Sequence, residues 1–355
     1  MITGKSISEL AAEIERQSRA MQDYIVPSSH MEMTEDLELA FDADAYPVTS
    51  IGHETISSRL GIPAKYYDRM RDEAPALLAR NVNTWLAQEG EQHVSRMVRT
   101  LDGGARAVLS DKYKRLDNYE FLNTVLPVLM DEHKMEVPSS EVTERRLYVQ
   151  ITFPGFDAEF SVTRGGAQVG EVIRAGVILK NSEVGYGARE ISFLAYTLAC
   201  KNGLVLPRSV GSFSTRHVGA RLGNGATFAL SSEAQQADAH AFALATRDAV
   251  RQMVSRDALQ SLVDSMTAAH GRKITGNVEQ SVKALGKSYS LPQGEQDSIL
   301  RHLIDGGDLS HYGLTNAITR TAEDAGSYDR AIELQEIGGV FLHMPERQLE
   351  PILAA

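Results

Sequence analysis

The run RLYVQITF (residues 146–153), followed by EFSVTR (159–164) and AQVGEVIRAGVILKN (167–181), decides the fold class of this chain. These runs are short, rich in β-branched and aromatic residues, and separated by glycine. Such segments are typical of strands joined by tight turns. ISFLAYTLACKNGLVLP (191–207) continues the pattern. We therefore predict four or five strands here that form a central, mainly antiparallel sheet.

The segments before these strands predict a hairpin and a helix. VSRMVRT (94–100) and ARAVLS (105–110) flank Asp102-Gly103-Gly104, and two β-rich runs around Asp-Gly predict a hairpin. NYEFLNTVLPVLMDEH (118–133) places Phe121, Leu122, Val125 and Leu129 on one stripe, although Pro127 interrupts it. We expect this helix to pack on a face of the sheet.

The flanks of the chain are predicted to be mainly helical. Helical spacing appears at residues 6–22 and 52–90, and residues 27–47 between them predict a loop with one short strand. Residues 231–270 predict one long helix or a helical hairpin, and further helices are expected at 276–289, 294–304, 312–324 and 327–337. The predicted fold is α+β, with a helical N-terminal region (1–92), a central α+β core (93–225) and a helical C-terminal region (226–355).

Composition excludes several classes of protein. The chain has 355 residues, a formal net charge of −11 and 43% hydrophobic residues, which is typical of a globular protein. Its single cysteine, Cys200, excludes an internal disulfide and a thiolate metal site, and no apolar run is long enough to cross a bilayer. No leader pattern is visible at the amino terminus, so we expect a cytoplasmic protein that does not act at a membrane.

Basic residues gather on the predicted hairpin and on the turn after it. Residues 93–221 hold 17 basic and 14 acidic residues, whereas both flanks are acidic. Cations neutralise the phosphates of a nucleic-acid strand, and the tyrosines between them, Tyr113 and Tyr119, offer rings on which unpaired bases stack. We expect Tyr113 to stack a base. The predicted single-strand interface combines the hairpin set with cations from later strands: Arg96, Arg99, Arg106, Lys112, Tyr113, Lys114, Arg115, Arg174, Lys180, Arg189 and Arg216.

Two other interpretations of these charges stay open. Outward positions of a strand are commonly charged only because they face water. Alternatively, the cations bind a small acidic ligand. No His-x-x-x-His pair, P-loop or dinucleotide fingerprint is present, so we expect no metal and no cofactor, and the lack of a catalytic motif favours a non-enzymatic role without deciding it.

Three motifs resemble a family of phage and plasmid proteins catalogued as domain of unknown function 932. They are Arg-x-Val-Leu-Ser-x-x-Tyr at Arg106–Tyr113, Cys-x-Asn-Gly at Cys200–Gly203, and Arg216-His217. The resemblance implies a mobile-element origin and says nothing about chemistry. By analogy of size and layout alone, the chain is similar to the annealing recombinases of the Red-beta and RecT type.

The sequence therefore predicts a phage or plasmid protein that binds or anneals single-stranded DNA as a homo-oligomer. The alternative is a non-enzymatic accessory protein whose helical C-terminal region binds a phage or host protein. A third possibility is an enzyme that acts on a small phosphorylated ligand, with Arg216 and His217 at the mouth of its site.

Overall fold

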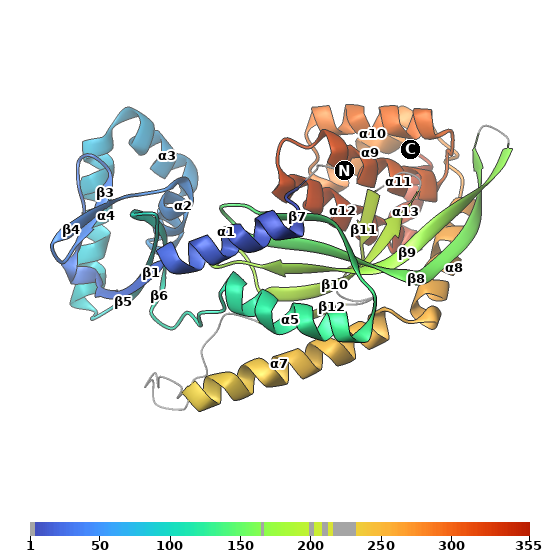
Figure 1. Cartoon of the computed structure of the whole chain (residues 1–355). Helices are drawn as coiled ribbons and strands as arrows, with labels where there is room; N and C mark the ends of the chain where they lie inside the picture. Colours follow the sequence, from blue (N-terminus) through green and yellow to red (C-terminus); the bar gives the residue numbers. More distant parts are fainter. Residues whose placement is uncertain (1–3, 165–166, 199–201, 208–211, 216–231) are drawn as a thin grey trace.

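The computed structural model of the chain describes residues 4–164, 167–198, 202–207, 212–215 and 232–355. Its architecture is mixed α+β with antiparallel sheets, which confirms the predicted fold class (Figure 1). Cys200, Arg216 and His217, on which two of the three family motifs depend, lie outside the described residues.

A six-stranded antiparallel sheet forms the centre of the molecule. Its strand order is β11-β10-β9-β8-β7, and β12 pairs with the remaining half of β10. The runs predicted at 146–153 and 159–164 form a single strand, β8, whose pairing with β9 shifts between Thr152 and Asp157. Gly155, at φ 96°, lies in this shift, and such bulges let a long strand bend. The strands are β7 (Glu136–Val142), β8 (Leu147–Arg164), β9 (Ala167–Asn181), β10 (Arg189–Thr197), β11 (Asn202–Val205) and β12 (Ser212–Thr215).

Helices cover both faces of this sheet (Figure 1). One face packs against α5 (Asn118–Glu132), α7 (Ser232–Met253) and α8 (Arg256–Gly271), and α1 (Ile7–Ala20) extends the same core. The stripe predicted on residues 118–133 is buried there. The other face packs against α12 (Tyr328–Leu342), whose Tyr328 and Ile332 contact a cluster of Tyr148, Ile178, Leu194 and Val205.

The N-terminal part of the chain forms a smaller unit with its own core. It contains two three-stranded sheets, ordered β1-β5-β6 and β2-β3-β4. Its strands are β1 (Gln22–Pro27), β2 (Met31–Met33), β3 (Glu38–Phe41), β4 (Asp44–Pro47), β5 (Ser95–Leu101) and β6 (Gly104–Ser110). Its helices are α2 (Ser50–Arg59), α3 (Ala64–Glu73), α4 (Pro75–Glu91) and the short η1 (Ser28–His30).

The prediction of one short strand within residues 27–47 is wrong, because three short strands form there and β1 precedes them. Each has only three or four residues, too few for alternation to stand out among the acidic residues around them. Met31, Met33, Leu39 and Phe41 nevertheless alternate into the core of this unit. The N-terminal region is therefore mixed rather than purely helical.

The predicted hairpin is confirmed as β5 and β6. Asp102 and Gly103 both have positive φ, at 53° and 80°, as a type I′ turn requires. Because β5 also pairs with β1, the hairpin shares a sheet with residues that lie before the boundary predicted at residue 92.

The C-terminal helices form a third core. All four helices predicted after residue 275 are present, and α13 was not predicted. The helices not yet named are α9 (Val278–Tyr289), α10 (Gln293–Gly306), α11 (His311–Thr321), η2 (Ala322–Asp324) and α13 (Glu346–Leu353). The stretch predicted as one long helix or a helical hairpin forms two helices, α7 and α8, and Ser255 caps the second by accepting a hydrogen bond from the Ala258 amide. Within the described ranges, no helix combines the length and apolar character needed to cross a membrane.

Candidate nucleic-acid interface

Strand β5 directs two of the predicted residues toward different parts of the molecule. Arg96 faces α4, where its Nε donates to Glu89 Oε2 at 3.0 Å, and its side chain is 14% exposed. Arg99 lies three positions along the strand and therefore points to the opposite face. That face meets the start of α5 and the connection between β9 and β10.

Arg99 is completely buried and binds two carboxylates. Its Nε donates to Asp23 Oδ1 at 2.7 Å, and its Nη2 donates to Asp23 Oδ2 at 3.1 Å and to Asp117 Oδ1 at 2.6 Å. Its Nη1 donates to the carbonyl oxygen of Glu183 at 3.0 Å. Burial by itself lowers the pKa of this guanidinium, but Asp117 and Asp23 more than offset that effect, so the pKa lies above its ordinary value.

Arg106 on β6 forms a second buried ion pair beside the first. Its Nη1 donates to Glu183 Oε2 at 2.9 Å, and the other oxygen of Glu183 accepts the Asn118 amide at the start of α5. Burial raises the pKa of Asp117 to about 6, although Arg99 acts in the opposite direction. We call Arg99, Arg106, Asp23, Asp117 and Glu183 the junction cluster, since it joins the N-terminal unit to the central sheet.

Apolar contacts close the same junction. Met97, Ala107 and Leu109 of the hairpin form a buried cluster with Ile51 of α2 and with Val184, which follows Glu183. The outward face of the hairpin is thus covered by a segment that is distant in sequence. Covering that face explains why Arg99 and Arg106, predicted to contact phosphates, are buried instead.

The turn after the hairpin is more open than the hairpin itself. Lys112 and Arg115 are exposed, and Arg115 keeps 53% of its side chain exposed although its Nε lies 3.1 Å from Asp23 Oδ2. Tyr119, the second residue of α5, is 41% exposed. We call Lys112, Arg115 and Tyr119 the connector surface.

Tyr113 and Lys114, which lie between these residues, are partly buried. The Tyr113 hydroxyl donates to the carbonyl oxygen of Ser182 at 2.9 Å, and burial raises the pKa of this phenol well above its ordinary value. Tyr113 therefore anchors the turn to the β9–β10 connection. The prediction that its ring stacks a base is wrong, because this contact keeps the ring packed inside the molecule.

The predicted cations of the later strands lie in separate contacts within the sheet. Arg174 pairs with Asp157 and Glu136, at 2.7 Å and 2.9 Å. Lys180 is buried and pairs with Glu190 at 2.9 Å and with Glu336 of α12 at 2.5 Å. The buried guanidinium of Arg189 lies 4.0 Å from the ring centroid of Phe242, which is a cation–π contact. Arg216 lies outside the described residues.

The structure thus brings Arg99 and Arg106 together, but inside the molecule, and leaves Lys112 and Arg115 at the surface beside Tyr119. Arg96, Arg174, Lys180 and Arg189 join neither group. Among the residues that the structure describes, no three His, Cys, Asp or Glu side chains are grouped so that they could hold a metal ion.

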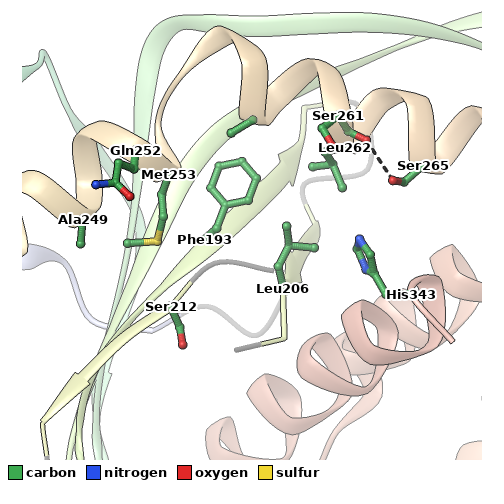
Figure 2. A pocket seen from close by; sticks show the side chains of 11 residues that line it. Phe193, Leu206, Ser212, Ala249, Gln252, Met253, Ser261, Leu262, Ser265 and His343 are labelled. Atoms are coloured by element: carbon green, nitrogen blue, oxygen red, sulfur yellow. Dashed lines mark hydrogen bonds between the residues drawn. The ribbon is translucent and has the colours of Figure 1, made fainter. Parts of the chain in front are cut away.

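The sequence did not predict a cavity of about 380 Å³ on the face of the central sheet that α7 and α8 cover (Figure 2). Residues of β10, α7, α8 and the end of α12 line it, among them Phe193, Met253 and His343. Because these residues lie up to 150 positions apart and form no local motif, no signal in the sequence could have grouped them.

Comparison with known proteins finds one family. The model of the family described as "Domain of unknown function (DUF932)" matches residues 105–334, more than half of the chain. The match begins in β6 and ends in α12, so it includes the connector surface and the central sheet. No curated protein matches the chain, and no solved structure does.

Proposed function

The chain belongs to the DUF932 family, and from its geometry we propose that it binds single-stranded nucleic acid through the connector surface. The observation that carries the proposal is the joint exposure of Lys112, Arg115 and Tyr119 within eight residues of chain. Of the acidic groups nearby, Asp117 and Glu183 are engaged by arginines inside the molecule, whereas Glu120 beside Tyr119 is exposed.

The three residues supply the two interactions that a single strand needs. Lys112 and Arg115 neutralise phosphates, and the exposed ring of Tyr119 offers a face on which an unpaired base stacks. Seven residue steps span at most about 25 Å, which is short enough for one extended strand to reach all three side chains.

We further propose that the protein is a cytoplasmic homo-oligomer of phage or plasmid origin that anneals single strands. An exposed strand edge supports self-association. β7 pairs with β8 only as far as Thr152, so from Asp157 to Arg164 the described part of the chain gives β8 a strand partner on one side only. A second copy that adds a strand there satisfies the remaining backbone groups.

The test is fluorescence anisotropy of a labelled single-stranded oligonucleotide, with the duplex in parallel. We expect saturable binding that favours the single strand. The logarithm of its affinity should fall with the logarithm of salt concentration with a slope of about −1.4, because two phosphates are neutralised. Lys112→Gln with Arg115→Gln should abolish this salt dependence.

The matched control is Lys65→Gln with Arg347→Gln, which removes the same charge from two exposed residues far from the connector surface in sequence. Equal loss of binding in both double variants indicates only a general charge effect and contradicts the proposed site. Absence of binding by the parent protein at low salt contradicts the function itself.

A second candidate function is protein recognition by the C-terminal helices. Ile304 at the end of α10 is 61% exposed, and Leu309 shortly after it is 44% exposed. Neighbouring exposed apolar side chains are typical of contact sites for another protein. Replacing both with Glu should then abolish capture of a phage or host partner and leave nucleic-acid binding unchanged.

A further inference from the structure

The cavity of about 380 Å³ lies where the central sheet meets α7, α8 and the end of α12. Figure 2 shows Phe193 at the centre of its lining, with Met253 on one side and Leu206 and Leu262 on the other. Its volume is within the range that small-molecule sites occupy in proteins, near the lower end.

The floor of this cavity is apolar and well packed. Phe193, Leu206 and Leu262 are each 3% exposed and Met253 is 8% exposed, and all four belong to the main core. An aromatic ring beside a thioether and two leucines favours a flat apolar ligand, since rings stack with an offset on Phe and contact sulfur favourably.

Polar groups surround this floor. They are three hydroxyls, one amide and one imidazole: Ser212, Ser261, Ser265, Gln252 and His343. Ser265 already donates its hydroxyl proton to the carbonyl oxygen of Ser261 at 2.9 Å. None of the described lining residues is Asp, Glu, Lys or Arg, which favours a neutral ligand, since burying a charge without a counter-charge is costly.

His343 has a defined hydrogen-bonding role in this site. Its Nδ1 lies 3.0 Å from the carbonyl oxygen of Gly339, and a carbonyl only accepts, so Nδ1 carries the proton. In the neutral ring, Nε2 is then an acceptor. Figure 2 shows the ring of His343 directed toward Leu206 and Ser265, on the cavity side of its helix.

We propose that this cavity is a binding site for a neutral, planar aromatic or heteroaromatic small molecule that donates one hydrogen bond to His343 Nε2. The apolar floor holds the ring system, and the imidazole fixes its orientation. This inference uses none of the residues of the connector surface and does not depend on nucleic-acid binding.

The probe for the test is N-phenyl-1-naphthylamine, which is neutral, planar in each ring, carries one N–H donor and fluoresces in apolar surroundings. We expect saturable binding of one probe to each intact chain. Ser265→Phe should abolish it by filling the cavity. Thr267→Phe adds the same ring at an exposed position of α8 that does not line the cavity, so it should bind as the parent does.

His343→Phe tests the hydrogen bond separately. It should weaken binding of the probe roughly two- to tenfold, the effect of one hydrogen bond, and leave binding of the N-methylated probe unchanged. Thermal unfolding of all three variants shows whether each of them folds. If Ser265→Phe does not fold, His343→Phe still tests the site.

Three results overturn the proposal. The first is no saturable binding to the parent protein, as expected if a second copy or another part of the chain fills the cavity. The second is equal binding to a folded Ser265→Phe variant and to Thr267→Phe. The third is equal weakening of both probes by His343→Phe.

Discussion

The junction cluster and the connector surface each contribute one arginine to the same carboxylate, but one arginine is buried and the other is exposed. Arg99 and Arg115 both approach Asp23, but the side chain of Arg99 is 0% exposed and that of Arg115 is 53% exposed. The two arginines lie only 16 positions apart in one basic stretch of sequence. Whether a second segment covers the residue therefore decides between a structural ion pair and a surface available to a ligand.

The junction cluster and the connector surface should differ most in how much their arginines contribute to the free energy of unfolding. Arg99→Met leaves Asp23 and Asp117 buried with a lost partner, which should lower the free energy of unfolding by about 3–5 kcal/mol. Urea denaturation measures it. Adding Asp117→Asn to this variant should restore part of the loss, because it removes one of the unpaired charges. A loss below about 1 kcal/mol shows that the cluster is solvated, as an exposed pair is.

The next largest difference between the junction cluster and the exposed surface should be in how the free energy of unfolding depends on pH. Because burial raises the pKa of Asp117 from 3.8 to about 6, the folded state binds a proton that the unfolded state has already released between these pH values. The contribution of Asp117 to stability is thus complete below pH 3.8 and declines as the pH rises toward 6, by about 3 kcal/mol at about 1.4 kcal/mol for each pKa unit.

Asp117→Asn should accordingly gain stability relative to the parent between pH 4 and pH 7, measured by urea denaturation at several pH values. Relative loss over this range means that the attraction of Arg99 exceeds the effect of burial. Asp102→Asn is the control, because it makes the same change at an aspartate whose side chain is 52% exposed.

A smaller effect is expected on the connector surface, and on binding rather than folding. Tyr119→Ala should weaken single-strand binding by about 1–3 kcal/mol through the loss of one stacked base, whereas Tyr119→Phe should retain it. Tyr66→Ala is a matched control because Tyr66 is 47% exposed, close to the 41% of Tyr119. Equal affinity of the two alanine variants in anisotropy titrations argues against stacking on Tyr119.

The smallest effect should come from Arg115→Gln. The side chain of Arg115 is 53% exposed, and Asp23, only 8% exposed, keeps Arg99 as a partner in this variant, so the loss of stability should be about 0–1 kcal/mol. Thermal unfolding should detect little change, in contrast to Arg99→Met. A loss of stability as large as that of Arg99→Met contradicts this prediction and shows that Arg115 has the same structural role as Arg99.

Local signals allowed much of the fold to be predicted. Asp102-Gly103 specified the hairpin, the stripe from Phe121 to Leu129 specified α5, and β-branched runs specified the central sheet. Each signal depends on residues that are close in sequence. The strands between residues 22 and 47 were missed because they are stabilised by the core of the N-terminal unit rather than by a pattern of their own.

The site could be predicted only in part. Residue type and spacing identified the basic stretch, but the contact from Arg99 to Glu183 joins residues 84 positions apart, and that from Arg106 to Glu183 joins residues 77 positions apart. A single sequence has no local pattern that identifies pairs of residues so far apart. The exposure of Tyr119, in contrast, follows from its place at the first turn of a helix whose buried stripe begins at Phe121.

The packing of α12 on the second face of the central sheet determines when that face can be covered during synthesis of the chain. Ser139 on β7 meets Tyr328 at 2.7 Å across 189 residues of sequence, and Gln150 on β8 meets Gln335 across 185. At about 5–20 residues per second, a ribosome needs roughly 10–40 s to add that length. During this interval the apolar face around Tyr148 and Ile178 lacks α12 as its cover on the nascent chain, so the order of synthesis delays completion of this core.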